Sequence, residues 1–189
     1  MAAYAAAGEL FLLWARGRLL DPEAGASQLR QALAAFMEQG NKLFVPFIHG
    51  LIAELEAMTG RADIALTSVD AGLALAEETG ERWTDPLLFR RKGEILFQRG
   101  PTTPAPAEEA FRTAIEIAKQ QGSRSFGLRA ALLLAKLYQS TGRPSDAHAV
   151  LAPTLEGFAP TAEMPEIDEA AALLVALAET DELKVSGRR

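Results

Sequence analysis

The chain has 189 residues, of which 49% are hydrophobic and 23% charged, and these values are typical of a single globular domain. Its formal net charge of −6 argues against a nucleic-acid partner, which usually requires a basic face. The absence of cysteine excludes disulfide bonds and thiolate metal sites, and it fits a cytoplasmic protein. The apolar N-terminal run lacks a basic start and no run reaches the length of a membrane span, so we expect neither a signal peptide nor a membrane partner.

The first helix is expected over residues 3–20. Asp21 followed by Pro22 then indicates a helix start, because a carboxylate caps the first turn and proline is tolerated at the first helical position. The same reasoning applies to Asp85 and Pro86, with a start one turn earlier as the alternative. The later helices are expected over residues 22–39, 45–59, 62–79, 86–99, 106–121, 125–141, 145–158 and 165–180.

Glycines recur about every 20 residues between these helices. They stand at Gly40, Gly60, Gly80, Gly100, Gly122 and Gly142. A glycine after an amphipathic stretch is typical of a helix C-terminus, where the backbone turns left-handed. Each interval leaves room for a helix of about 14 to 18 residues and a short turn.

Two segments are expected to lie outside the helices. The Pro-rich stretch 101–106 predicts an exposed loop, and residues 181–189 are expected to fray as a C-terminal tail. Apolar and polar residues do not alternate as they do in strands, and the β-branched residues are scattered. The sequence therefore predicts one all-α domain over residues 1–180.

A pattern of small, large and small residues, spaced by four and three positions, recurs with a period near 40. Its copies are Gly25, Leu29 and Ala32; Ala65, Val69 and Gly72; Ala107, Phe111 and Ala114; and Ala147, Leu151 and Thr154. The pattern suits a helix that nests closely between two neighbours, and the period is that of helix-pair repeats. We predict a right-handed α-solenoid of about four antiparallel helix pairs with a C-terminal capping helix.

One stretch resembles the tetratricopeptide repeat. Its first helix contributes Leu134, Ala135 and Tyr138, and its second contributes Ala147 and Leu151. The helix pairs of this chain are therefore expected to be TPR-like, although the period is near 40 instead of the usual 34.

Longer runs resemble the C-terminal TPR-like region of large bacterial signalling proteins. They include FRRKGEIL and AEEAFRTAIEIAKQQGSRSFGLRAALLLAKLYQSTGR, and the resemblance covers about residues 12–177. Those proteins place an adenylate/guanylate cyclase domain or a DNA-binding regulator domain ahead of an NTPase module. The resemblance implies a fragment or a stand-alone relative of such a protein. It does not carry over the cyclase or NTPase chemistry, since no phosphate-loop motif occurs in the sequence.

No residue pattern in the sequence indicates catalysis, a cofactor or a metal. His49 and His148 stand on different expected helices, whereas a histidine metal site needs clustered ligands. Paired carboxylates such as Glu77 and Glu78 lie at a helix end, and acid–base catalysis would need them in a pocket. We therefore expect a protein that is not an enzyme.

The predicted binding site is a groove on the concave side, lined by the first helix of each pair. Its predicted residues are Phe47, Glu54, Met58, Leu87, Arg90, Glu94, Gln98, Arg129, Leu132 and Lys136. Spacings of three and four place each set on one helical face. One end is expected to be apolar and the other basic, with Arg90, Arg129 and Lys136 receiving an acidic segment. The alternative is that these charges are solvated and that Arg90 pairs with Glu94 along its own helix.

Two functions follow from these expectations. The first is a regulatory module that binds a peptide, an acidic segment or an upstream domain of the parent protein in the groove. The alternative is a sensor that encloses a small effector and controls an upstream enzymatic or DNA-binding domain. The apolar cluster from Phe11 to Trp14 also predicts self-association through the N-terminal end.

Overall fold

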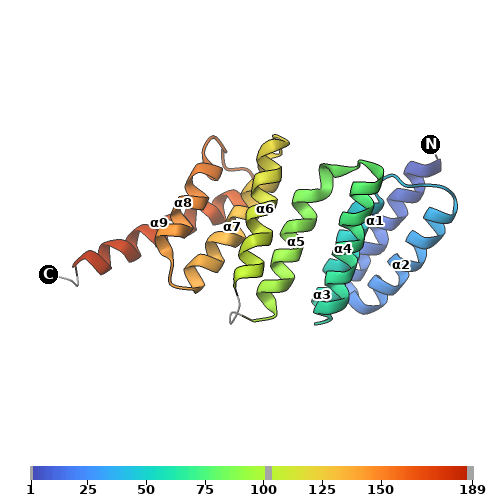
Figure 1. Cartoon of the computed structure of the whole chain (residues 1–189), viewed down its shortest axis with the longest axis horizontal. Helices are drawn as coiled ribbons and strands as arrows, with labels where there is room; N and C mark the ends of the chain where they lie inside the picture. Colours follow the sequence, from blue (N-terminus) through green and yellow to red (C-terminus); the bar gives the residue numbers. More distant parts are fainter. Residues whose placement is uncertain (1, 101–103, 187–189) are drawn as a thin grey trace.

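The computed structural model describes residues 2–100 and 104–186, and side chains from 7 to 179 within that span. This part of the chain is all-α, with nine α-helices, one 3₁₀ turn and no strand (Figure 1). The helices are α1 (Ala2–Leu20), α2 (Pro22–Glu38), α3 (Val45–Met58), α4 (Ala62–Thr79), α5 (Asp85–Gln98), α6 (Ala105–Gln120), α7 (Arg124–Ser140), α8 (Pro144–Leu155) and α9 (Pro165–Ser186). The 3₁₀ turn η1 (Arg82–Thr84) precedes α5.

Most helix ends lie within one or two residues of the sequence prediction. Each of the six recurring glycines has a positive φ, between 67° and 140°, as a helix-ending residue requires. The Asp21 carboxylate caps α2 as predicted and accepts hydrogen bonds from the backbone amides of Glu23 and Ala24. Repeated glycines and caps therefore set the helix boundaries locally.

Three boundaries differ from the prediction. α8 ends at Leu155 instead of residue 158, because Glu156 adopts an extended backbone and Gly157 has a φ of 76°. α9 continues to Ser186, and the predicted fraying of residues 187–189 lies outside the described residues. α6 begins already at Ala105, so the predicted loop is shorter, and its residues 101–103 are likewise not described.

The start of α5 also differs in chemistry. Thr84 occupies the N-cap position, and its side chain makes no capping bond, so Asp85 is not the cap that the sequence predicts. The buried Asp85 carboxylate instead accepts a hydrogen bond of 2.5 Å from Nε of Arg82. The inserted turn η1 brings these two side chains together.

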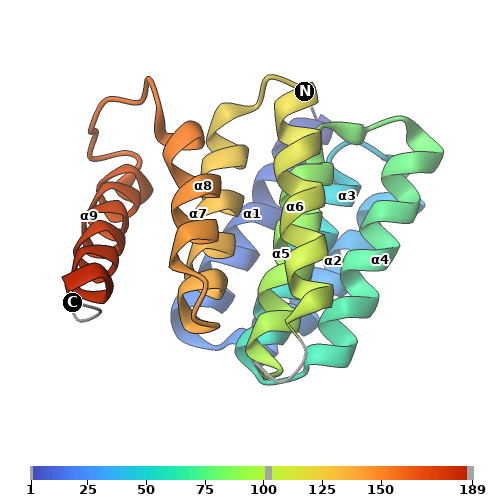
Figure 2. The ribbon, with the colours of Figure 1, turned by 60° about the vertical axis from the view of Figure 1, so that its left-hand side comes forward.

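The helices follow one another in a row, and each turns back against the one before it (Figures 1 and 2). The odd-numbered helices also contact one another in series: α1 with α3, α3 with α5, α5 with α7, and α7 with α9. Buried apolar side chains form three clusters along the row, which include Leu29 and Ile52, then Val69 and Leu88, then Phe111 and Leu137. The core is therefore distributed along the stack.

The repeated small-large-small pattern marks close helix contacts. The large members Leu29, Val69, Phe111 and Leu151 are all fully buried. A Cβ atom added to Gly93 would lie 2.6 Å from the ring of Phe111, so this ring packs directly on the α5 backbone. The pattern therefore identifies the core face of each second helix, as predicted.

The N-terminal helix exposes part of its apolar surface. Leu12, Leu19 and Leu20 of α1 are all largely exposed, whereas Trp14 is half-buried and faces α3. Self-association through this end stays a prediction. No helix in the described part of the chain combines the length and the apolar character needed to cross a membrane.

Candidate functional site

A cleft of about 540 Å³ runs across the odd-numbered helices. It is lined by Trp14, Arg18, Phe47, Leu51, Glu54, Leu87, Arg90, Arg91, Glu94, Arg129, Leu132, Leu133, Lys136, Glu166 and Glu169, and we call it the cleft. These side chains come from α1, α3, α5, α7 and α9. The cleft exists because these five helices contact one another in series and present one face to the same side.

Eight of the ten predicted groove residues line the cleft. They are Phe47, Glu54, Leu87, Arg90, Glu94, Arg129, Leu132 and Lys136. The other two, Met58 and Gln98, are the last residues of α3 and α5 and are exposed beyond the cleft. Glycine register therefore finds the correct helical face, but it extends the predicted groove one turn too far.

Seven lining residues were not predicted. They are Trp14, Arg18, Leu51, Arg91, Leu133, Glu166 and Glu169. A signal for Trp14 was present, because it stands 40 residues before Glu54 and so shares its place in the repeat. Glu166 and Glu169 had no such signal, since α9 follows an irregular segment and carries no copy of the pattern.

The first end of the cleft is apolar. Phe47 stacks on Trp83 with ring centroids 5.6 Å apart, and its ring also lies 5.8 Å from that of Phe11. The residue before α3, Phe44, has a φ of 64°, an unusual conformation for a residue with a side chain. Its backbone amide donates to the Glu81 carboxylate at 3.0 Å, which holds this turn against the start of α5.

Glu54 is the hub at the opposite, charged end. Its buried carboxylate accepts a hydrogen bond from Nε1 of Trp14 at 3.2 Å. It also pairs with Arg18 at 3.4 Å and with Nη2 of Arg91 at 2.9 Å. α1, α3 and α5 therefore meet at one carboxylate, so this part of the cleft wall is held in place by three different helices.

Arg90 and Arg91 form the charged floor that α5 contributes. Arg91 pairs with Glu94 at 2.6 Å, and Arg90 pairs with the same carboxylate. Burial lowers the pKa of Arg90 from its usual value, and the charge of Glu94 opposes that shift. The buried Nε of Arg91 has no hydrogen-bond partner among the described residues. A donor is therefore left over in the cleft wall.

α9 supplies carboxylates to the cations of α7. Nε of Arg129 contacts Glu166 at 2.8 Å, and Nζ of Lys136 contacts Glu169 at 2.6 Å. As described, the cleft lining holds five cations and four carboxylates, so its charged end is nearly balanced rather than basic. The alternative of pairing along one helix holds for Arg90 and Glu94, whereas the α7 cations pair between helices.

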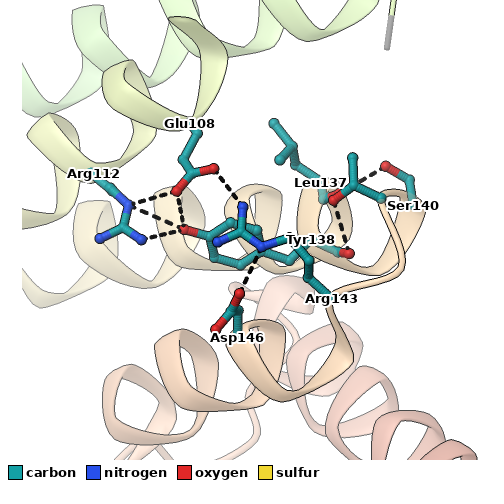
Figure 3. A network of polar contacts seen from close by, with 8 residues as sticks. Glu108, Arg112, Leu137, Tyr138, Ser140, Arg143 and Asp146 are labelled. Atoms are coloured by element: carbon teal, nitrogen blue, oxygen red, sulfur yellow. Dashed lines mark hydrogen bonds and ion pairs between the residues drawn. The ribbon is translucent and has the colours of Figure 1, made fainter. Parts of the chain in front are cut away.

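A second polar network lies between α6, α7 and α8 (Figure 3). The Tyr138 hydroxyl donates to Glu108 at 2.8 Å and accepts from Nη2 of Arg112 at 2.7 Å. Arg143 pairs with the other Glu108 oxygen at 2.7 Å and lies over the Tyr138 ring at 4.2 Å. Burial and the bond to Glu108 raise the pKa of Tyr138, which favours its neutral form and makes it a poor base. The network therefore joins helices.

Metal and cofactor chemistry gains no support from the side chains present. Among the described residues, no group of three or more His, Asp or Glu side chains could hold a metal ion. His49 lies on α3 and His148 on α8, on different elements as the sequence indicates. The cleft is therefore the candidate site, and its chemistry is that of binding.

Comparison of the chain with protein-family models, with curated proteins and with solved structures finds no match. The TPR-like resemblance is therefore an expectation from residues alone. A functional proposal has to rest on the cleft itself.

Proposed function

We propose that this chain is a non-catalytic protein-interaction or regulatory module that binds a peptide or a neighbouring domain in the cleft. The observation that carries the proposal is the convergence of side chains from five helices on one cleft with an apolar end and a charged end. In the same proposal the fold is a right-handed, TPR-like α-solenoid, and the cleft lies on its concave side. The parent would be a cytoplasmic bacterial signalling protein of the cyclase or NTPase type.

The two ends of the cleft suit different parts of a peptide. Phe47, Leu51 and Leu87 offer apolar contact for a large side chain, which is the kind of anchor that contributes most to binding. Arg129 and Lys136 are each partly exposed and can bind carboxylates, which would steer association and set the orientation. A ligand that spans both ends would be an acidic segment with an aromatic or aliphatic anchor.

A small-effector sensor is the second candidate. The unpartnered Nε of Arg91, beside the largely buried Arg90, is a convergent polar group of the kind found in small-molecule sites. The cleft volume of about 540 Å³ is also within the range of such sites. In this version an anionic effector would bind the α5 arginines.

Binding of acidic peptides that carry one tryptophan, followed by fluorescence anisotropy, tests the leading proposal. The R129E/K136E variant should bind at least about tenfold more weakly, and the wild-type affinity should fall as salt rises. R16E/K119E is the matched control, because both of its residues are exposed cations outside the cleft lining. Circular dichroism confirms that both variants keep their helices. Equal binding by wild type and R129E/K136E would contradict the proposal.

The sensor is separated by a different ligand set. Small dicarboxylates and nucleoside phosphates would raise the thermal unfolding midpoint of the wild-type chain if the cleft encloses such an effector. The same anions should have no effect on a chain with Arg91→Met, which keeps the aliphatic length but loses the guanidinium. A midpoint that rises equally in both chains would exclude the α5 arginines as the effector site.

A further inference from the structure

In this structure the α7 cations at the charged end of the cleft are occupied by the chain itself. Glu166 and Glu169 stand three positions apart in the first turns of α9, so they share one helical face. Together they reach Arg129 and Lys136, which lie two turns apart on α7. α9 thus presents two carboxylates, one turn apart, to the two cations that the proposed function assigns to a partner.

Apolar packing, rather than these ion pairs, holds α9 on the stack. Ile167, Ala170 and Leu177 are all buried in the C-terminal core cluster, against α7 and α8. The side chains of Lys136 and Glu169 are 39% and 52% exposed, and pairs of this kind contribute little to stability. The two carboxylates can therefore leave their cations while α9 stays folded and in place.

α9 also satisfies the charged end incompletely. The second carboxylate oxygen of Glu166, Oε2, is buried and has no hydrogen-bond partner among the described residues. A buried acceptor without a partner is unfavourable, because it loses its bonds to water and gains none in return. A partner whose carboxylates bind the α7 cations without burying an unpaired oxygen would have an advantage over α9.

We propose that the acidic first turns of α9 are a built-in competitor for the cleft, and that the partner is an acidic helical segment with the spacing Glu-x-x-Glu. This inference rests on the proposed function and names the partner class for the same site. Because α9 is tethered, its carboxylates compete at a high effective concentration. A partner therefore binds only when its apolar anchor adds enough affinity at the other end of the cleft, and α9 rejects acidic segments that lack one.

Neutralising α9 tests the competition. The probe is a synthetic, fluorescein-labelled, Ala-rich helical peptide with one Glu-x-x-Glu pair and a terminal tryptophan, and its matched form carries Gln at both acidic positions. The E166Q/E169Q variant keeps side-chain size and should bind the acidic peptide about three- to tenfold more tightly than wild type, because each lost pair is weak. It should show no gain for the Gln peptide.

A control variant separates local competition from the general field of the protein. E163Q/D168N removes the same charge from exposed positions beside and on α9 that are outside the cleft lining. This variant should bind the acidic peptide no more than about twofold more tightly, since exposed charges at a distance are screened by salt. Urea unfolding of all three chains confirms that each is folded at the assay temperature.

The outcomes distinguish the inference from the proposed function. Equal affinity of wild type and E166Q/E169Q for the acidic peptide would overturn the competition while the binding function stands. An equal gain in E163Q/D168N and E166Q/E169Q would overturn the assignment to Glu166 and Glu169. If neither wild type nor E166Q/E169Q binds the acidic peptide, the proposed function and the inference both fail.

Discussion

The α2–α3–α4 corner and the α6–α7–α8 corner hold the same arrangement with different chemistry. Each surrounds an outer cleft, of about 340 Å³ in the first corner and about 450 Å³ in the second. Lining positions correspond when the sequence is shifted by 82 residues: Arg30 with Arg112, Leu33 with Ile115, Ile52 with Leu134, and Ser68 with Val150. By the same shift Glu56 corresponds to Tyr138.

The N-terminal corner buries a charge. Glu56 is only 1% exposed, and its carboxylate pairs with Arg30 and accepts a hydrogen bond of 2.7 Å from the Ser68 hydroxyl. The C-terminal corner buries the ring of Tyr138 instead and keeps Glu108, Arg112 and Arg143 at the rim (Figure 3). A repeat position that tolerates either solution is defined by size and by one polar contact. The two corners should then differ in how far each depends on its arginine.

The largest expected difference is between Arg30→Met and Arg112→Met. Arg30→Met leaves the buried Glu56 carboxylate with Ser68 as its remaining partner and should reduce the free energy of unfolding by about 3 kcal/mol. Arg112→Met should reduce it by less than about 1 kcal/mol, because Glu108 keeps Arg143 and the Tyr138 hydroxyl. Urea unfolding followed by circular dichroism measures both. Similar losses would show that the corners are energetically alike.

Tyr138→Phe should have the next largest effect. The variant keeps the packed ring and removes a hydroxyl that joins Glu108 to Arg112, so a loss of about 1 kcal/mol is expected. Adding Arg112→Met should cause little further loss, because both changes remove the same hydrogen bond. Urea unfolding of the single and double variants completes the cycle. Full additivity would mean that hydroxyl and guanidinium do not act together.

Mild acid should weaken the N-terminal corner first. Burial, and then the positive charge of Arg30, lower the pKa of His49 from its usual 6.5. The unfolded chain then binds the proton more readily, so the stability from neutral His49 is complete above pH 6.5 and falls as the pH drops toward the lowered value. Unfolding midpoints between pH 7.5 and 5 should fall less in His49→Gln than in wild type. The exposed His148 provides the control, as His148→Gln, and equal slopes in all three chains would refute the assignment.

The smallest effect is expected at the C-terminal corner in stronger acid. Burial would raise the pKa of Glu108, but hydrogen bonds from Tyr138 and Arg143 and the nearby arginine charges outweigh it, so the pKa is lowered from 4.5. Stability from the charged carboxylate is complete above pH 4.5 and is lost as the pH falls through the lowered value. Glu108→Gln should flatten this part of the profile. The exposed Glu109→Gln should leave it unchanged, and a flat wild-type profile would contradict the prediction.

The sequence by itself determined the helices and the face that each repeat buries. Recurring glycines end helices through their own backbone conformation, and small-large-small spacing follows from the helical period, so both are local properties. The same period located eight of the ten cleft residues on α3, α5 and α7. It failed at Met58 and Gln98, where the helices end and the neighbouring wall stops.

Only the tertiary structure decided what the charged side chains meet. Arg129 and Lys136 are paired because α9 crosses α7 at their level, and the position of α9 depends on an irregular segment that no repeat register covers. Glu54 likewise joins α1 and α5 because three helices converge on it. A cation's place on a helix follows from local period, whereas its partner depends on distant helices that apolar packing brings together. The sequence therefore determined where the cleft lies, and the packing of α1 and α9 decided that its charges are nearly balanced.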